Sequence, residues 1–353
     1  MTTKYSYLKT KLLTVALVIF TLINVTACNR SVDKKPVTKT NFMLDTLIKI
    51  QAFGPNASEA IDEAFNRIAD IEKKMTVKAE SSEVIEINKR AGEGFYTVSS
   101  DTFFVIKKSL QYAKLSKGKF DITVGPLVKL WGIGTEEARV PITSEINETL
   151  PLVDYRQVEL NEDENGVFLK KHGMAIDLGG IAKGYAADEV VKTLRKNGVK
   201  SGIADLGGNI FVLGSKPDGK PWKIGWQNPF DTRGSIFAIV EVTDKTLVTS
   251  GPYERFFKKN EKMYHHILDT YSGFPVENGL MGVTIVSDVS IDADALSTAV
   301  FSLGLEDGMK FVEEQKHIDA VFITNDYKVY TSSGIKNYNF EIINKRFHIS
   351  NLD

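Results

Sequence analysis

Asp294 and Thr298 place a carboxylate and a hydroxyl four residues apart in a segment, 292–302, whose apolar pattern predicts a helix. Residues four apart lie on one helix face, so the two oxygens are expected side by side. Hard oxygen ligands of this kind suit Mg²⁺, which keeps several waters and takes further oxygens from substrate phosphates. Such a pair is also common on plain helix surfaces, so the spacing alone leaves both interpretations open.

A glycine-rich stretch, Ile176 to Tyr185, reads I-D-L-G-G-I-A-K-G-Y and runs into residues with helical periodicity. Glycines at the start of a helix let backbone N–H groups approach an anion closely. The stretch therefore predicts either a cradle for phosphate or pyrophosphate, or a tight turn with nothing bound. The adjacent residues His265 and His266, which precede Asp269, also allow two interpretations. They are either functional or form a strand end with local hydrogen bonds.

Composition narrows the function classes. The chain has 353 residues, a net charge of −1 and 42% hydrophobic residues, which is typical of a globular protein. A nucleic-acid-binding protein usually needs a basic surface, so this balance argues against one. No cluster of cysteine and histidine with zinc-ligand spacing occurs, and no Walker A, G-x-S-x-G, H-E-x-x-H or G-x-G-x-x-G pattern is found. What remains points to phosphate chemistry.

The N-terminus predicts export. Three lysines precede an apolar run over 12–25, and the run ends in V-T-A-C at Cys28, the only cysteine. The ending resembles a bacterial lipobox, in which the cysteine is lipidated and begins the mature chain. An uncleaved membrane anchor is the alternative, and either places the rest of the chain outside the cytoplasm. The expected organisation is a signal peptide over 1–27, the lipidated Cys28 and a polar tether over 28–40, and one domain over 41–353.

The rest of the chain alternates irregularly between helical and strand patterns, which predicts a single α+β domain of mixed sheets and helices. A helix capped by Ser58 and a second helix over 102–116 are expected, followed by a buried glycine-rich loop over 118–134. Later helices are expected over 292–302 and 305–315. The expected strands lie at 44–53, 155–160, 166–171, 201–205, 210–213, 222–226, 236–242, 246–248, 283–287, 319–324 and 328–332, with a terminal strand or tail over 335–349.

Five motifs, in order, resemble the ApbE family of FAD:protein FMN transferases, which are extracytoplasmic bacterial lipoproteins. The motifs are G-K-F-D-I-T-V-G-P-L-V-K-L-W-G-I-G (118–134), D-L-G-G-I-A-K-G-Y-A-A-D (177–188), T-S-G-P-Y-E-R-F (249–256), H-H-I-L-D-T-Y-S-G (265–273) and D-A-L-S-T (294–298). The resemblance covers nearly all of the chain from residue 41. It implies an ApbE-like, T-fold-related domain.

The resemblance also implies roles for single residues. Asp294 and Thr298 match the family's metal-binding D-A-L-x-T, with the carbonyl of Gly180 as a third ligand. Ser297 stands where some members have a second acid, which leaves its part open. His266 matches the family's H-I pair and is the candidate general base, since a neutral imidazole can take a hydroxyl proton.

Further positions match the family's flavin nucleotide contacts: Asp177 and Lys183 flank bound FAD, Lys119, Phe120 and Asp121 meet its adenine part, Met43 meets its flavin part, and Ile267 lies beside the nucleotide. There is one departure. Many members carry an aromatic residue shortly after the first helix, stacked on the flavin ring, and this chain has Lys78 there.

The activity implied is a Mg²⁺-dependent transfer of FMN from FAD, the substrate, to a Ser or Thr hydroxyl of a partner flavoprotein, with AMP released. Physical reasoning agrees, because a metal on pyrophosphate oxygens offsets charge that develops in the reaction. The alternatives are a FAD pyrophosphatase giving FMN and AMP, and a FAD-binding lipoprotein without catalysis. The implied partners are FAD, an extracytoplasmic flavoprotein acceptor and the membrane. The implied location is the outer side of the cell membrane, held by lipid on Cys28.

Overall fold

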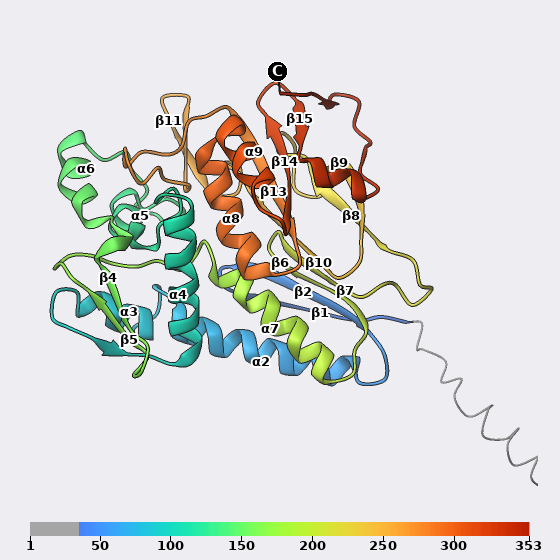
Figure 1. Ribbon diagram of the computed structural model, residues 1–353, viewed down its shortest axis with the longest axis horizontal. Helices are drawn as coiled ribbons and strands as arrows, with labels where there is room; N and C mark the ends of the chain where they lie inside the picture. The colour runs from blue at the N-terminus through green and yellow to red at the C-terminus, as the bar shows by residue number, and fades with distance from the viewer. Residues whose placement is uncertain (1–34, 353) are drawn as a thin grey trace, which may run out of the picture.

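A computed structural model describes residues 35–352 of the chain (Figure 1). The expected signal peptide, the lipidated Cys28 and most of the polar tether lie outside these residues. Within the described part, no helix combines the length and the apolar character needed to cross a membrane.

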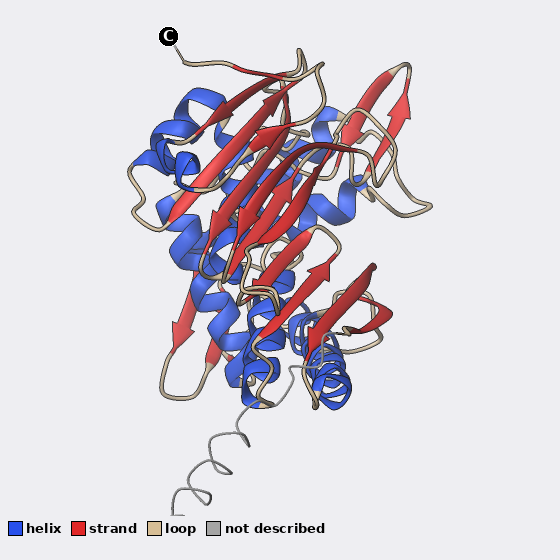
Figure 2. Cartoon of the chain, turned by 90° about the vertical axis from the view of Figure 1, so that its right-hand side faces the viewer, coloured by secondary structure: helices blue, strands red, loops and turns tan. Residues whose placement is uncertain are grey.

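The centre of the fold is a nine-stranded sheet in the order β1-β2-β6-β7-β10-β13-β14-β15-β17. Its neighbours pair antiparallel, except for the parallel pair β15–β17. The strands are β1 Val37–Met43, β2 Thr46–Phe53, β6 Ser201–Leu206, β7 Asn209–Leu213, β10 Lys245–Ser250, β13 Leu280–Ser287, β14 Ile318–Thr324, β15 Lys328–Thr331 and β17 His348–Ile349. Figure 2 shows the long strands running side by side across the molecule.

Both faces of this sheet are buried at its central strands, and the sequence of β14 shows why. Successive side chains of a strand point to opposite faces. Ala320 and Phe322 join one apolar cluster with helix residues, whereas Val321 and Ile323 join a second cluster with residues of a smaller sheet. That smaller sheet has the order β16-β9-β8. The fold is therefore layered, with helices on one face of the large sheet and a three-stranded sheet on the other.

The helical layer contains α2 Ala57–Met75, α7 Ala182–Lys196, α8 Ser290–Leu303 and α9 Leu305–Glu313. Figure 1 shows α2 and α7 running together below the point where α8 begins. Helix α7 presents small and branched residues, from Ala186 to Leu194, to the main apolar cluster. This packing sets the start of α7 against α8, which is where the motif residues meet.

The remaining elements form a region beside α4 Ser100–Leu115. They include α3 Glu83–Lys89, α5 Gly125–Trp131, α6 Thr143–Thr149, the 3-10 turns η1 Ile122–Val124, η2 Leu150–Leu152 and η3 Tyr155–Gln157, and the sheet of β3 Tyr96–Thr97, β5 Gly166–Leu169 and β4 Val158–Asn161. The smaller sheet consists of β8 Trp222–Gln227, β9 Ile236–Val242 and β16 Glu341–Ile342. A separate hairpin consists of β11 Phe256–Lys259 and β12 Lys262–His265, and η4 covers Ser333–Asn337.

The expected α+β class is confirmed, and so are most strands and helices. Some boundaries were wrong. Strand β1 begins at Val37, so the last four residues of the expected tether are part of the large sheet, because they pair with β2. Helix α2 begins at Ala57 after Asn56, which leaves Ser58 inside the first turn rather than at the cap. The short helix α3 was not anticipated, and of the hairpin β11–β12 the sequence indicated only an aromatic strand beginning near Phe256 and a strand end at the histidine pair.

Candidate functional site

The site forms where α7 and α8 touch. At Gly184 the two helices are so close that a Cβ atom would lie 2.4 Å from the carbonyl oxygen of Ser290 and 2.7 Å from the Cβ of Asp294. The Gly184 N–H donates to Oδ2 of Asp294 at 2.8 Å. Only glycine fits at this position, because any side chain would meet a backbone atom of α8. The hydrogen bond from the Gly184 N–H holds one oxygen of the Asp294 carboxylate in place.

Asp188, one turn further along α7 on the same face, also ties the two helices together. Its two carboxylate oxygens accept from the first backbone N–H groups of α8, those of Ser290 at 2.8 Å and Ile291 at 2.9 Å. These groups have no partner within their own helix, and a negative charge there is favoured by the helix dipole. Burial raises the pKa of Asp188 to about 6, so the carboxyl group is ionised at neutral pH.

The three predicted metal ligands converge at this junction. Asp294 is 4% exposed, and its second oxygen, Oδ1, lies 3.9 Å from the ammonium of Lys183. A Cβ on Gly180 would lie 3.8 Å from Oγ1 of Thr298 and 3.2 Å from the ring of Phe120. Residues more than 110 positions apart in the sequence therefore bring a carboxylate, a hydroxyl and a glycine backbone together.

This donor set fits a hard divalent cation. Within residues 35–352, no group of three or more His, Cys, Asp or Glu side chains is placed to hold a metal. A cation at this site would thus rely on one carboxylate, a hydroxyl and a backbone carbonyl, which are oxygen donors of the kind Mg²⁺ prefers when phosphates supply the rest. Because Gly180 has no side chain, its backbone can come close to a cation bound beside Thr298.

Sequence reasoning missed a hydroxyl cluster around Thr298. Ser250, at the end of β10, lies 2.8 Å from the hydroxyl of Ser297 and 3.4 Å from that of Thr298. Ser297 donates to the carbonyl of Asp294 at 2.9 Å, so Ser250 must donate to Ser297. A lone pair of Ser250 then faces Thr298 and can accept its proton. Ser297 therefore holds Ser250 in place through a hydrogen bond. The T-S-G motif at 249–251 is the sequence feature from which Ser250 could have been found.

The loop before α7 is folded on itself. Oδ1 of Asp177 accepts from the N–H of Gly179 at 2.7 Å, and the N–H of Asp177 donates to the carbonyl of Ile122 at 2.8 Å. Lys183 reaches back to the carbonyl of Gly179 at 3.1 Å. Its ammonium therefore lies between this loop and Asp294, where it can meet a phosphate.

The two histidines differ in what their rings do. His265 is buried, and both of its ring nitrogens are used. Nε2 lies 2.8 Å from the carbonyl of Val276, and Nδ1 accepts from the N–H of Ile267. This matches the interpretation of a strand end with local hydrogen bonds. Burial lowers its pKa. His265 is thus a neutral structural residue.

His266 keeps one nitrogen for chemistry. Its Nδ1 lies 3.2 Å from the carbonyl of Arg255, which can only accept, so the neutral ring carries its proton on Nδ1. Nε2 then has a free lone pair. Burial, together with the positive charges of Arg255 and Lys183, lowers the pKa of His266 to about 4. The ring is therefore neutral at physiological pH and lies within the field of Lys183.

The three residues predicted to contact the adenine part of FAD, which are Lys119, Phe120 and Asp121, differ in what they contact in the structure. Lys119 lies 3.2 Å from the carboxylate of Asp269, and its ammonium is 5.0 Å from the centre of the Tyr271 ring. Lys119 and Asp269 border a cavity of about 460 Å³. Phe120 packs against the Gly180 backbone, as described above.

Both carboxylate oxygens of Asp121 already accept hydrogen bonds within the chain. It accepts from the backbone and hydroxyl of Thr123 and from the N–H of Tyr155, and burial raises its pKa. These bonds fix the 3-10 turn η1 beside Asp177. The geometry indicates a positioning residue, and its predicted contact with a nucleotide stays a prediction.

The predicted flavin side lies at the turn between β1 and β2. Met43 ends β1 and is 9% exposed. Lys78, the departure from the family pattern, forms an ion pair of 2.7 Å with Asp45 in this turn. A Cβ on Gly207 would clash with Thr46, so the Gly207-Gly208 turn between β6 and β7 packs here too. Ile267, predicted beside the nucleotide, is 6% exposed and follows His266.

Comparison with known proteins identifies the family. The family model described as the ApbE family matches residues 44–322. This chain belongs to the ApbE family. Two relatives, from Klebsiella pneumoniae and Treponema pallidum, carry the name FAD:protein FMN transferase. The first is 38% identical and covers 76% of this chain and 83% of its own length. The second is 34% identical and covers 89% and 91%.

Solved ApbE structures have the same fold. The ApbE protein of Thermotoga maritima superposes with a TM-score of 0.80 and 31% identity, and it covers 86% of this chain and 99% of its own length. The flavin transferase ApbE of Vibrio cholerae gives a TM-score of 0.78 and 28% identity over the same shares. The single α+β domain expected from the sequence is therefore that of the ApbE family.

Proposed function

We propose that this ApbE chain is an enzyme that transfers FMN from FAD to a Ser or Thr hydroxyl of a partner flavoprotein and releases AMP, with Mg²⁺ as cofactor. The observation that carries the proposal is the convergence of Gly180, Asp294 and Thr298 in a chain whose relatives are named FAD:protein FMN transferases. A protein that only carried flavin would need neither buried oxygen donors nor a free imidazole nitrogen.

The reaction balances with the groups present. The acceptor oxygen forms a bond to the FMN-side phosphorus, the bond from that phosphorus to the bridging oxygen breaks, and AMP leaves with the electron pair. The acceptor proton goes to Nε2 of His266, whose neutral state at physiological pH leaves it free to take one. Lys183 brings a positive charge to the diphosphate.

The metal has a supporting part in this proposal. Mg²⁺, when bound, would offset the charge that develops on the phosphate oxygens. Asp294, Thr298 and the Gly180 carbonyl would hold it, with the Asp294 carboxylate oriented by Gly184. Asp177 and Lys183 would keep the glycine loop in shape beside the diphosphate.

The test is to replace Asp294 by Ala. We expect transfer to an acceptor to fall by at least about 100-fold, the size associated with loss of one major electrostatic contribution in a site. The measurement is the mass gain of the acceptor in the presence of FAD and Mg²⁺, together with release of AMP. Undiminished transfer by Asp294→Ala would refute the metal assignment.

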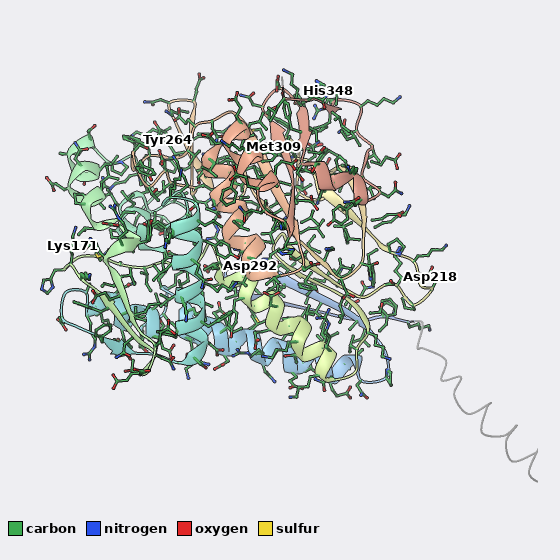
Figure 3. All side chains as sticks on the ribbon, in the orientation of Figure 1. Lys171, Asp218, Tyr264, Asp292, Met309 and His348 are labelled. Carbon is green, nitrogen blue, oxygen red and sulfur yellow. The ribbon has the colours of Figure 1, made fainter. Side chains whose placement is uncertain are left out.

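Asp292→Ala is a matched control. Asp292 lies on the same helix, α8, but bonds to Lys108 at 3.0 Å on another side (Figure 3). It should leave transfer nearly unchanged. With wild-type protein, free FMN and AMP without a labelled acceptor would support the pyrophosphatase alternative, and unchanged FAD would support a carrier.

We further propose that the domain is held outside the cytoplasm by a lipid on Cys28, so that its acceptors are extracytoplasmic flavoproteins. The support is the order of basic residues, an apolar run and V-T-A-C before the single cysteine. The domain limits 1–27, 28–40 and 41–353 belong to this proposal, with the tether shortened by the start of β1 at Val37.

A further inference from the structure

The hairpin β11–β12 stands apart from the larger sheets. Its two strands pair with each other and form a sheet of their own. It stands at the upper edge of the molecule in Figure 1. A two-stranded hairpin has little stability of its own, so one face must pack on the body. Phe257 stacks on Tyr264 with ring centres 5.3 Å apart, and Tyr264 lies 5.6 Å from Trp131 (Figure 3 labels Tyr264).

The other face is left uncovered. Because side chains alternate along a strand, Phe256 and Lys258 point away from the packed face. Phe256 is 43% exposed. Within residues 35–352, Arg255, Lys258 and Lys259 are exposed and form no ion pair, in contrast to many lysines of this chain. Three cations without an ion pair among the described residues therefore surround one exposed aromatic side chain, and the exposed carboxylates of Glu254 and Glu261 lie at the two ends of the segment.

This surface is continuous with the candidate site. The segment begins at Ser250, which contacts Thr298, and ends at His266. The carbonyl of Arg255 accepts from the N–H of His266 at 3.1 Å, which fastens the base of the hairpin to the candidate general base. A protein whose hydroxyl reaches His266 must therefore pass beside the hairpin.

Lys258 and Lys259 are better placed to contact a partner protein than to contact FAD. Lys258 lies opposite Met263, and Lys259 lies opposite Lys262, toward the tip. From His266 they are three to four residues along the strands, roughly 10–13 Å at the usual rise. A phosphate held at Asp294 and Lys183 is served by nearer groups. The hairpin lysines can instead attract a second surface that approaches the site.

Arg255 and Lys259 alternate with Phe256 and Lys258 but are exposed at the two ends of β11. We propose that the exposed side chains of Arg255, Phe256, Lys258 and Lys259, here called the hairpin face, form the docking surface for the acceptor protein, and that the acceptor presents acidic groups around an apolar contact beside its Ser or Thr. This inference rests on the proposed transferase function. Opposite charges mainly raise the rate of encounter, and the effect weakens with salt. The apolar contact at Phe256 supplies the part that salt does not weaken.

The experiment compares two double charge reversals. Lys258→Glu with Lys259→Glu changes the hairpin face, and Lys200→Glu with Lys220→Glu makes the same change in net charge elsewhere. Lys220 lies two residues from Asp218, which Figure 3 places on the opposite side from Tyr264. The probe is a purified flavoprotein acceptor without its flavin and with its acceptor Thr intact, and a version with Val at that position is the blank.

At low ionic strength the hairpin variant should lose about tenfold in kcat/KM for the acceptor, within the range by which steering changes association rates. The loss should shrink at high salt, and the control pair should match wild type. Binding of FAD and its slow hydrolysis to FMN and AMP should be unchanged in all variants. Lys258→Gln with Lys259→Gln should give a smaller loss of the same kind.

Three results would overturn the inference. These are an unchanged kcat/KM for the acceptor, an equal loss in both double variants, or a loss of FAD affinity in the hairpin variant, which would assign the lysines to FAD. Failure of the proposed function looks different. There the wild-type protein itself leaves the acceptor unlabelled while it binds or hydrolyses FAD.

Discussion

His266 is one of the groups through which pH acts on this site, alongside Asp188. Its pKa is lowered to about 4 by burial and by the positive charges of Arg255 and Lys183, against an ordinary value of 6.5. Between about pH 4 and 6.5, His266 is therefore mostly neutral in the folded chain and mostly protonated in the unfolded chain. The stabilising contribution of His266 is complete above about pH 6.5 and is lost as the pH falls toward 4.

We expect His266→Gln to reduce transfer by about 100-fold or more, the usual range for loss of a general base. The variant should bind FAD as the wild type does. Between pH 7 and 4.5 its free energy of unfolding should fall less steeply than that of the wild type, because Gln takes up no proton. Urea unfolding at both pH values measures this difference.

His317→Gln is the control for the unfolding measurement, since His317 is exposed. Equal slopes for wild type and His266→Gln would contradict the lowered pKa. Full transfer activity in His266→Gln would move the base to another group.

At the scale of elements, the joint between α7 and α8 decides the geometry of the site. Asp188 of α7 caps α8, and Asp294 of α8 accepts from Gly184 of α7. The two contacts lie one helical turn apart on α7 and fix both the distance and the rotation of α8. Since Asp294 and Thr298 share a face of α8, this joint directs both toward Gly180.

Gly184→Ala should force the helices apart, because the new Cβ would meet a backbone oxygen that cannot move freely. We expect a loss of about 1–3 kcal/mol in the free energy of unfolding, as for overpacked core positions. Asp188→Asn should cost about 1 kcal/mol, the size of a lost helix cap. Both variants should also bind Mg²⁺ more weakly in the presence of FAD, measured by calorimetry.

Lys192→Ala, at an exposed position of α7, is the control and should change neither quantity by much. Weakened metal binding separates a positioning role from simple destabilisation, because a merely less stable fold would bind normally below its unfolding temperature. Normal Mg²⁺ affinity in Gly184→Ala would show that the joint does not position Asp294.

At the scale of the whole molecule, the large sheet separates two tasks. One face carries the helices that form the site, and the other is covered by the three-stranded sheet, whose cluster includes Trp226 and Phe237. Strand β1 at the sheet edge is the point where the chain enters the described domain, close to the expected tether (Figure 1). Attachment of the molecule is thus expected to depend on the segment before it.

We expect Cys28→Ala to release the protein from the membrane fraction, because the lipidated thiol would be missing and a single apolar run is otherwise removed with the signal peptide. Cell fractionation and labelling with a fatty acid measure the outcome. Since Cys28 is the only cysteine, label on the wild type has a single possible thiol. A variant that stays in the membrane would support the uncleaved anchor instead.

Several features could be predicted from the sequence because they depend on neighbours along the chain. The alternation of apolar residues gave the strands, and helical periodicity gave α2, α4, α7 and α8. The spacing of Asp294 and Thr298 placed two oxygens on one face for the same local reason. The glycine-rich stretch before α7 could also be identified from the sequence, although its ligand could not.

The tertiary structure decided what those residues meet. Gly180 faces Thr298, Gly184 admits the backbone of α8, and Ser250 joins the hydroxyl cluster across more than 45 residues of chain. Asp121 was predicted to contact a nucleotide, and the structure adds that its carboxylate accepts bonds from Thr123 and Tyr155. Such contacts depend on the packing of distant elements, and no periodicity encodes them. The shared helix face of Asp294 and Thr298 could be predicted because their spacing is local, whereas their surroundings follow from how α7 and α8 pack.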